Sequence, residues 1–360
     1  MRVAFVIPGV AGGGVRSVTR IAEGLAGRGH EVMVLFRRQT RSLRDRARDW
    51  YLGARYGRRQ SWLSGFPGVA RCYERLTGDV VGAQDVVVGV GVSCVLEIAE
   101  LPAWCGVKVH NCRGVEPWVG EAMDRAWSLP MPRIVIAAHL EKLMRERGSS
   151  DPIYIASNGV DRKSYFASVT EAERLGLGTV FHGGAVKDPD LLLDVLNRVV
   201  EARPATPVHV FGSYPRPSRL PSGARYVRFP TTAQARDCYS RCRVWFVGSR
   251  NEGLPNPSLE AMACGCAVVS TACGGPNDVL DNGRGGILVP VGDATAMTDA
   301  VLKLLKDDAL RAEYSQAARD IVDRYTWPGA VEKFEAALRD IVAGAPNREA
   351  DAGRALVAVP

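Results

Sequence analysis

Short apolar runs alternate along the chain with longer segments of helical periodicity. In the first part of the chain these runs predict strands at 3–8, 30–36, 85–90, 107–111, 134–137 and 153–155. A second series predicts strands at 179–182, 208–211, 226–229, 244–247, 267–270 and 286–289. Strands that alternate with helices form parallel sheets with right-handed crossovers. The pattern therefore predicts two doubly wound α/β domains, which 360 residues can readily supply.

The domains are expected to join where the Asn158-Gly159 turn signal is followed by a polar stretch. This division gives an N-terminal domain over 1–165 and a C-terminal domain over 166–326. Residues 345–360, rich in Ala, Gly and charge, are expected to form a loose tail.

Composition favours a cytoplasmic globular protein. The chain is 46% hydrophobic and 24% charged, and no apolar run approaches the roughly 18–20 residues of a membrane span. The first apolar run, at 3–8, is too short for a signal-peptide core. Nine cysteines form no Cys-x-x-Cys pair, which indicates buried thiols and no bound metal.

The positive charge is concentrated in one segment, from Arg37 to Arg59. It holds nine arginines against two aspartates, a net +7 that equals the formal charge of the whole chain. Such a segment is either a solvated helix and loop or a contact for an anionic acceptor or membrane surface. The second alternative would make the protein peripheral to a membrane. We expect no nucleic-acid partner.

The first strand is followed by a glycine-rich loop with Gly12, Gly13 and Gly14. It is not a dinucleotide fingerprint, because Ser17 stands where the third glycine would be and no acidic residue ends the second strand. A nicotinamide-dependent oxidoreductase is therefore disfavoured. The loop instead predicts a close approach of the backbone to a phosphate at a helix N-terminus.

The segment 245–270 reads as strand, loop, helix and strand. Asn256 is a good N-cap, Pro257 suits the first helical position, and Gly265 suits the helix end. The loop 249–255 then lies at the carboxyl end of a strand, where open α/β sheets bind ligands. Helix amides there favour a diphosphate, and Glu252 and Glu260 are placed to accept sugar hydroxyls.

This segment resembles the donor-binding signature of the retaining glycosyltransferases of family 4, the glycosyl transferases of group 1, which have the GT-B fold. Glu252 and Glu260 match its two glutamates, which are separated by seven residues. Further similarity follows in order at the glycine loop, at 157–161 with Phe166, and at 325–327. The resemblance implies that a final helix, about 327–343, returns to the first domain.

The resemblance also implies the roles of the donor residues. Glu252 would touch the transferred sugar and Glu260 the ribose of a nucleoside diphosphate sugar. The implied donor contacts are Gly12, Gly13, Gly14, Lys187, Gly253, Leu254, Asn256, Pro257, Ser258 and Glu260. Lys187 would neutralise the leaving diphosphate. Many relatives have an arginine a few residues before this lysine, whereas this chain has Gly184, so Arg250 is a candidate substitute.

The strand at 107–111 continues into a polar loop that should face the cleft. His110 resembles a family histidine near the donor sugar, although an isolated histidine is more often a structural hydrogen-bonding residue. Arg113, Glu116 and Trp118 are the candidate acceptor contacts. His182 could line the cleft as well.

These features predict a retaining glycosyltransferase that moves a hexosyl-type sugar to a hydroxyl acceptor: a glycan, a lipid-linked intermediate or a small natural product. The expected mechanism is front-side attack without a covalent enzyme nucleophile or a metal. One alternative is a non-catalytic sugar-nucleotide or glycan-binding protein on the same scaffold, suggested by Gly184. An isomerase or phosphorylase of GT-B shape is a weaker alternative, because no phosphate or pyridoxal site is evident. Fold alone does not decide between them.

Overall fold

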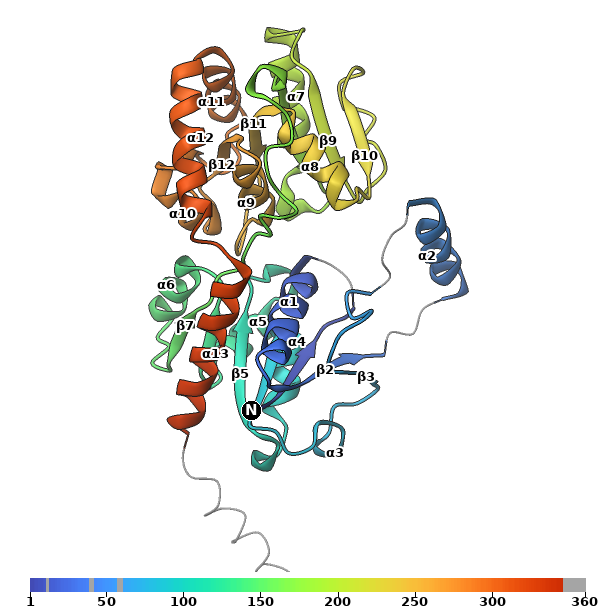
Figure 1. Ribbon diagram of the computed structural model, residues 1–360. Coiled ribbons are helices and arrows are strands. Elements are labelled where there is room, and N and C mark those ends of the chain that lie inside the picture. The colour runs from blue at the N-terminus through green and yellow to red at the C-terminus, as the bar shows by residue number, and fades with distance from the viewer. Residues whose placement is uncertain (11–12, 39–41, 57–60, 346–360) are drawn as a thin grey trace, which may run out of the picture.

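The computed structural model describes residues 1–10, 13–38, 42–56 and 61–345, which form two lobes, each built on a parallel sheet (Figure 1). The first sheet has the order β3-β2-β1-β4-β5-β6-β7. Its strands are β1 (Arg2–Ile7), β2 (Glu31–Arg37), β3 (Val69–Tyr73), β4 (Val86–Val90), β5 (Val107–Cys112), β6 (Arg133–Val135) and β7 (Ile153–Ile155). All of its strand pairs are parallel.

The second sheet has the order β10-β9-β8-β11-β12-β13 and is also parallel. Its strands are β8 (Gly176–Phe181), β9 (Val208–Gly212), β10 (Arg225–Arg228), β11 (Cys242–Val247), β12 (Ala267–Thr271) and β13 (Gly286–Val289). This is the strand order of a doubly wound nucleotide-binding sheet. The prediction of two doubly wound α/β sheets is confirmed.

Helices cover both faces of each sheet. Those of the first lobe are α1 (Gly13–Gly27), α2 (Leu43–Tyr56), α3 (Gly78–Val81), α4 (Gly91–Ala99), α5 (Glu121–Ser128) and α6 (Ala138–Glu146). The remainder are α7 (Pro189–Ala202), α8 (Thr232–Ser240), α9 (Asn256–Ala263), α10 (Gly275–Val279), α11 (Ala294–Lys306), α12 (Asp308–Val322) and α13 (Trp327–Ala343). No helix in these ranges is long and apolar enough to cross a membrane.

The edge strand β3 is the one strand of the described chain that the apolar pattern did not predict. Four of its five residues are exposed and only Tyr73 is buried. An exposed edge strand needs no apolar run, because it has one neighbour and its outer face meets water. The central strands β1 and β4 bury almost every residue, so their sequences are apolar throughout and they were predicted as strands.

Two chain segments run side by side where the lobes meet. Val160 forms an isolated parallel bridge with Thr326. A Cβ atom on Gly159 would lie 2.2 Å from the backbone nitrogen of Trp327, so only glycine permits this approach. Thr326 accepts a hydrogen bond from the Gly329 amide and caps α13, which then crosses to the first lobe (Figure 1).

Helix α13 packs against α1 and β1. Gly24 of α1 leaves room for Val331, and the rings of Phe5 and Phe334 lie 5.8 Å apart. Glu335 of α13 is 8% exposed and pairs with Arg28 and with His30, whose Nε2 lies 3.0 Å from a carboxylate oxygen. This contact joins the C-terminal helix to the N-terminal βαβ unit.

The Glu335→Gln variant tests this contact. Hydrogen bonds from Arg339, then from His30 and Arg28, lower the pKa of Glu335 from 4.5 to about 2. A carboxyl group whose pKa is lower in the folded chain than in the unfolded chain stabilises the fold at pH values above its unfolded pKa. That stabilisation is lost as the pH falls toward 2. Each kcal/mol lost should lower the Tm by about 2–4 °C. We expect a lower Tm for Glu335→Gln at pH 7 and a smaller difference from wild type below pH 4.

The matched control is Glu332→Gln, because Glu332 is an exposed residue of the same helix. Its Tm should equal that of the wild type. Equal Tm values for the Glu335→Gln and Glu332→Gln proteins at pH 7 would contradict the proposed stabilising role.

Candidate functional site

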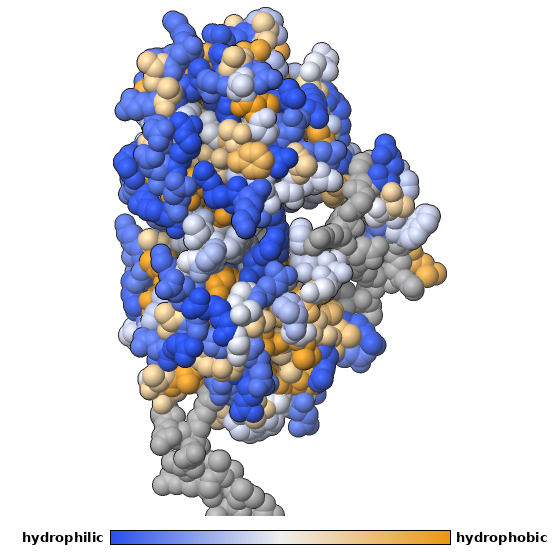
Figure 2. Space-filling model, viewed as in Figure 1, coloured by the Kyte–Doolittle hydropathy of each residue, from blue (hydrophilic) through white to orange (hydrophobic). Residues whose placement is uncertain are grey.

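The predicted site residues gather where the carboxyl ends of the two sheets meet. The glycine loop follows β1, the segment with Lys187 follows β8, and the loop with Glu252 follows β11. In both sheets the strand order reverses at these strands, which is where doubly wound folds bind ligands. Hydrophilic residues gather at the waist between the lobes (Figure 2).

Lys187 and Glu252 form an ion pair at the centre of this region. The Lys187 Nζ lies 2.6 Å from Oε1 of Glu252, and the Ser249 hydroxyl donates to the same oxygen at 2.7 Å. The Lys187 side chain is 36% exposed and the Glu252 side chain 12%. A cation that is open to solvent and a carboxylate with hydrogen bonds thus lie together at a strand end.

The candidate substitute for the missing arginine is already paired. Arg250 Nη2 lies 2.8 Å from Asp188, and the Arg250 backbone amide donates to the Val186 carbonyl. Gly184 donates its amide to His182 Nδ1. Burial lowers the pKa of His182, Lys187 lowers it further and Glu252 opposes this. His182 is therefore electrostatically coupled to the Lys187–Glu252 pair.

Glu260, one turn into α9, lies 14% exposed at the contact between the lobes. Its Oε2 accepts a hydrogen bond from Tyr239 at 3.0 Å, and its Oε1 lies 3.5 Å from Arg16 of the first lobe. Burial raises the pKa of Glu260, and Arg16, Tyr239 and Tyr165 oppose that rise. The carboxylate is held by groups from both lobes.

Helix α9 begins at Asn256, one residue earlier than predicted, and the prediction that Asn256 is its N-cap is wrong. The cap position is Pro255 and no side chain caps the helix. The Asn256 amide group instead accepts from Asn158 at 2.9 Å and donates to the Ser17 hydroxyl at 3.4 Å. Asn158 in turn accepts from Arg113 at 2.6 Å. This chain of hydrogen bonds crosses between the lobes.

The loop before α9 touches the first lobe directly. A Cβ atom on Gly253 would lie 1.9 Å from the Arg113 carbonyl oxygen, so this position accepts only glycine. Leu254 is 7% exposed, Pro257 is partly exposed, and Ser258 is fully buried with no hydrogen-bond partner for its hydroxyl in the described chain. Leu254 therefore packs into the core, while Ser258 is enclosed within α9.

The helix that follows the glycine loop begins at Gly13. Among the described atoms none lies within 4 Å of a Cβ atom built on Gly13, and one on Gly14 would lie 4.0 Å from Arg113 Nε. The first turn of α1 thus lies beside Arg113, a residue of the contact between the lobes. Gly12 lies outside the described residues.

His110 is almost completely buried. It lies on β5, is 1% exposed, and its Nδ1 has no hydrogen-bond partner among the described atoms. Burial, with a contribution from Arg133, lowers its pKa to about 3, so the imidazole is neutral at physiological pH.

The three predicted acceptor contacts differ in their surroundings. Burial lowers the pKa of Arg113 to about 10, and this side chain belongs to the contact between the lobes. Glu116 accepts from the Val92 amide at 3.0 Å, and burial raises its pKa. Trp118 is 66% exposed. Trp118 is therefore open to solvent, whereas Arg113 and Glu116 are held by hydrogen bonds within the protein.

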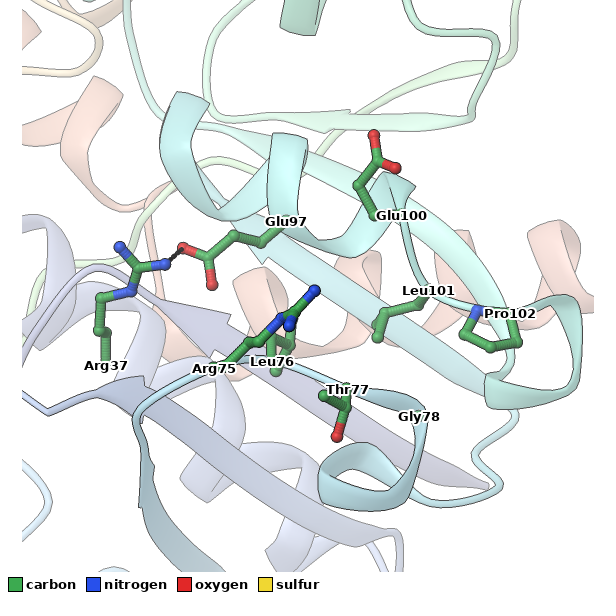
Figure 3. Close-up of a pocket in the computed structure, with 9 residues that line it drawn as sticks. All are labelled: Arg37, Arg75, Leu76, Thr77, Gly78, Glu97, Glu100, Leu101 and Pro102. Carbon is green, nitrogen blue, oxygen red and sulfur yellow. Dashed lines mark ion pairs between the residues drawn. The ribbon is translucent and has the colours of Figure 1, made fainter.

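Part of the arginine-rich segment is neutralised locally. Arg37 Nη2 lies 3.3 Å from Glu97, and Arg38 Nη1 lies 2.9 Å from Glu74. Arg37 lines a pocket of about 420 Å³ on the flank of α4, with Arg75 at its centre (Figure 3). The complete lining is Arg37, Arg75, Leu76, Thr77, Gly78, Glu97, Glu100, Leu101 and Pro102. None of the predicted donor residues lines this pocket.

Helix α2 carries the middle of the segment and stands away from the two sheets (Figure 1). Leu43 is 80% exposed, Trp50 71% and Tyr51 55%. Arg44 and Arg55 are exposed on the same helix. Arg41, Arg58 and Arg59 lie outside the described residues.

Sequence reasoning missed three contributors: Arg16, Asn158 as a link between the lobes, and Tyr239. Arg16 lies two residues after the glycine loop, in the first turn of α1, a position that could have drawn attention to it. Tyr239 carried no such signal.

Seven cysteines are buried. In the described ranges no three His, Cys, Asp or Glu side chains form a group that could hold a metal ion.

Comparison with known proteins agrees with this geometry. The family model described as glycosyl transferases group 1 matches residues 176–307. A phosphatidyl-myo-inositol mannosyltransferase of Mycolicibacterium smegmatis is 39% identical over 106 residues, which cover 27% of this chain and 28% of the relative. A D-inositol 3-phosphate glycosyltransferase of Xylanimonas cellulosilytica is 30% identical over 236 residues, which cover 58% of this chain and 55% of the relative. The matches thus cover 28% and 55% of the lengths of these two relatives.

The fold matches solved structures over nearly the whole chain. Anabaena HepE in complex with UDP-glucose has a TM-score of 0.73 at 14% identity, covering 94% of this chain and 99% of that one. A sucrose-phosphate synthase from Thermosynechococcus elongatus has a TM-score of 0.71 at 15% identity, covering 95% and 99%. The predicted GT-B fold is confirmed. The resemblance to the glycosyl transferases of group 1 is confirmed as well, and residues 176–307 match the model of that family.

Proposed function

We propose that the protein is a retaining glycosyltransferase that uses a nucleoside diphosphate sugar. The observation that carries the proposal is the Lys187–Glu252 ion pair at the carboxyl end of the second sheet. Lys187 follows β8, and Glu252 lies in the loop that leads into α9, the helix with Glu260. These residues supply a cation for the phosphate, a carboxylate for the sugar and a second carboxylate for the ribose. The family model covers the helix with Glu260 and the strands around it.

Lys187 and the helix amides act on the diphosphate. The N-terminus of α1 and the loop before α9 both lie beside Arg113 at the contact between the lobes, and helix N-termini favour negative charge. A diphosphate would compete with Glu252 for Lys187. Glu252 is then released to accept hydrogen bonds from the transferred sugar, while Lys187 stabilises the charge that develops on the leaving group.

The reaction proceeds by front-side attack of an acceptor hydroxyl on a hexosyl group, with retention of configuration and no covalent enzyme nucleophile. The leaving phosphate takes the acceptor proton. Because His110 is neutral, it can accept or donate a hydrogen bond near the sugar without adding positive charge. Closure of the lobes would bring this buried residue and the donor together.

The acceptor is expected on the first lobe, near Trp118 and α2. Both curated relatives described above are named for acceptors that contain inositol, and both names include phosphate or phosphatidyl groups. An anionic acceptor suits the arginines of the segment 37–59. The exposed Leu43, Trp50 and Tyr51 suit contact with a membrane surface that presents such an acceptor.

A non-catalytic sugar-nucleotide or glycan-binding role is the second candidate. It is favoured by one observation: Arg250 is held by Asp188, so Lys187 is left without the second cation seen in many relatives. Both candidates predict donor binding. They differ in whether the bond between sugar and phosphate is broken.

The Lys187→Ala and Glu252→Gln variants test catalysis. Glu252→Gln should keep nucleoside diphosphate affinity within about threefold, and Lys187→Ala should reduce it. Both should lower turnover by on the order of a hundredfold, because each removes an interaction that strengthens in the transition state. Hydrolysis and transfer are measured with a panel of UDP- and GDP-sugars at saturating concentration.

The control is Lys303→Ala, in the last turn of α11, away from the site. Wild-type initial rates in the Lys187→Ala protein would remove Lys187 from the mechanism. Tight binding of a nucleotide sugar by the wild type, with no cleavage in the presence or absence of acceptor, would favour the binding protein.

Helix α2 is tested with a Leu43→Ser, Arg44→Gln, Trp50→Ser triple variant. Each cation near an anionic surface contributes about 1 kcal/mol, and this attraction fades over a Debye length. We expect wild type to co-sediment with phosphatidylglycerol vesicles at low salt and the triple variant to bind at least tenfold more weakly. Trp104→Ser serves as control, since Trp104 is 50% exposed and lies outside this segment. Equal, salt-independent co-sedimentation of all three proteins would leave α2 as a solvated helix.

A further inference from the structure

Arg16 is a residue of the first lobe whose side chain lies beside Glu260 of the second lobe. It lies in the first turn of α1, and its guanidinium is 5.5 Å from the centre of the Trp62 ring. On its other side, Nη1 lies 3.5 Å from Oε1 of Glu260. The side chain is 33% exposed. The aromatic ring and the carboxylate together fix the guanidinium between the lobes.

Glu260 can accept from ribose hydroxyls only while it is ionised. The groups that face it are Arg16 from α1, Tyr165 from the domain join, Tyr239 from α8 and Cys264 from the end of α9. Arg16 is the one cation among them in the described chain. The two tyrosines are hydrogen-bond donors, but they stay neutral and cannot offset a buried charge to the same degree.

Tyr239 and Arg16 approach different oxygen atoms of the Glu260 carboxylate. Tyr239 donates to Oε2 at 3.0 Å, while Arg16 approaches Oε1 at a distance longer than a normal hydrogen bond. Tyr165 is a further hydrogen-bond partner of the carboxylate. The charge of Glu260 is therefore stabilised by groups from both lobes, and the one cation among the described residues that approaches it is Arg16.

We infer that Arg16 is a positioning residue for the donor nucleotide, which acts across the lobes by keeping Glu260 charged and oriented for the ribose. This inference rests on the proposed function, since it requires a ribose at Glu260. It goes beyond that function by giving the first lobe a part in nucleotide affinity. Because Arg16 is on the first lobe, nucleotide affinity should depend on the approach of the two lobes.

The test is a double-mutant cycle with Arg16→Gln and Glu260→Gln, measured by calorimetry with UDP and with GDP. We expect Arg16→Gln to weaken nucleotide binding at pH 7 by on the order of tenfold, and Arg16→Lys to restore part of the loss. In the Glu260→Gln background, Arg16→Gln should cause no further loss. Arg20→Gln, one turn along α1 and paired with Glu23, is the matched control and should bind as wild type does.

A pH profile separates this role from a structural one. Burial raises the pKa of Glu260, so affinity should fall as the pH drops through that pKa. In Arg16→Gln the loss should occur at higher pH, and affinity should recover as the pH rises. A uniform loss at all pH values would indicate a structural effect and overturn the inference.

Two other outcomes also contradict it. Tighter nucleotide binding by Arg16→Gln would mean that Arg16 competes with the ribose. Unchanged affinity in Arg16→Gln, with reduced affinity in Glu260→Gln, would overturn the role of Arg16 and leave the proposed function intact. If Glu260→Gln binds nucleotide as wild type does, or if no nucleoside diphosphate binds the wild type, the ribose assignment fails first and this inference with it.

Discussion

The arrangement of the site depends on the contact between the lobes at Gly253. The backbone of this residue lies against the Arg113 carbonyl so closely that no side chain could be accommodated. Next to it, hydrogen bonds run from Ser17 through Asn256 and Asn158 to Arg113. Together these contacts set the distance between the carboxyl ends of the two sheets. They therefore decide whether Arg16 can reach Glu260.

This contact has a consequence for binding. Many polar groups of the site are already paired with one another: Lys187 with Glu252, Arg250 with Asp188, and Glu260 with Tyr239. Pairing limits the free-energy cost of placing charges at a partly buried site. In the proposed function, a diphosphate that replaces Glu252 at Lys187 would exchange one ion pair for another. The charged side chains of the site are thus already paired with one another in this structure.

Much of the fold followed from the sequence, because buried parallel strands are apolar throughout and their helices are amphipathic. Strand β3 escaped prediction because an exposed edge strand has no such pattern. At the site, glycine, proline and glutamate spacing predicted the loop and helix that hold Glu252 and Glu260. The partners of these residues could not be predicted, since Arg16 and Tyr239 are far from Glu260 in sequence and only the packing of three helices brings them together. Asn256 was misjudged for the same reason: its local role as a cap is replaced by a tertiary contact.

The central claim is that the facing carboxyl ends of the two sheets hold a nucleoside diphosphate sugar between them. Hydrogen–deuterium exchange with and without UDP or GDP tests this claim most directly. The account predicts slower exchange on nucleotide binding in the N-terminal turn of α1, in residues 184–188, and in the segment from Ser249 to Glu260. Protection confined to other regions, such as the pocket beside α4, or no change in any peptide at saturating nucleotide, would contradict it.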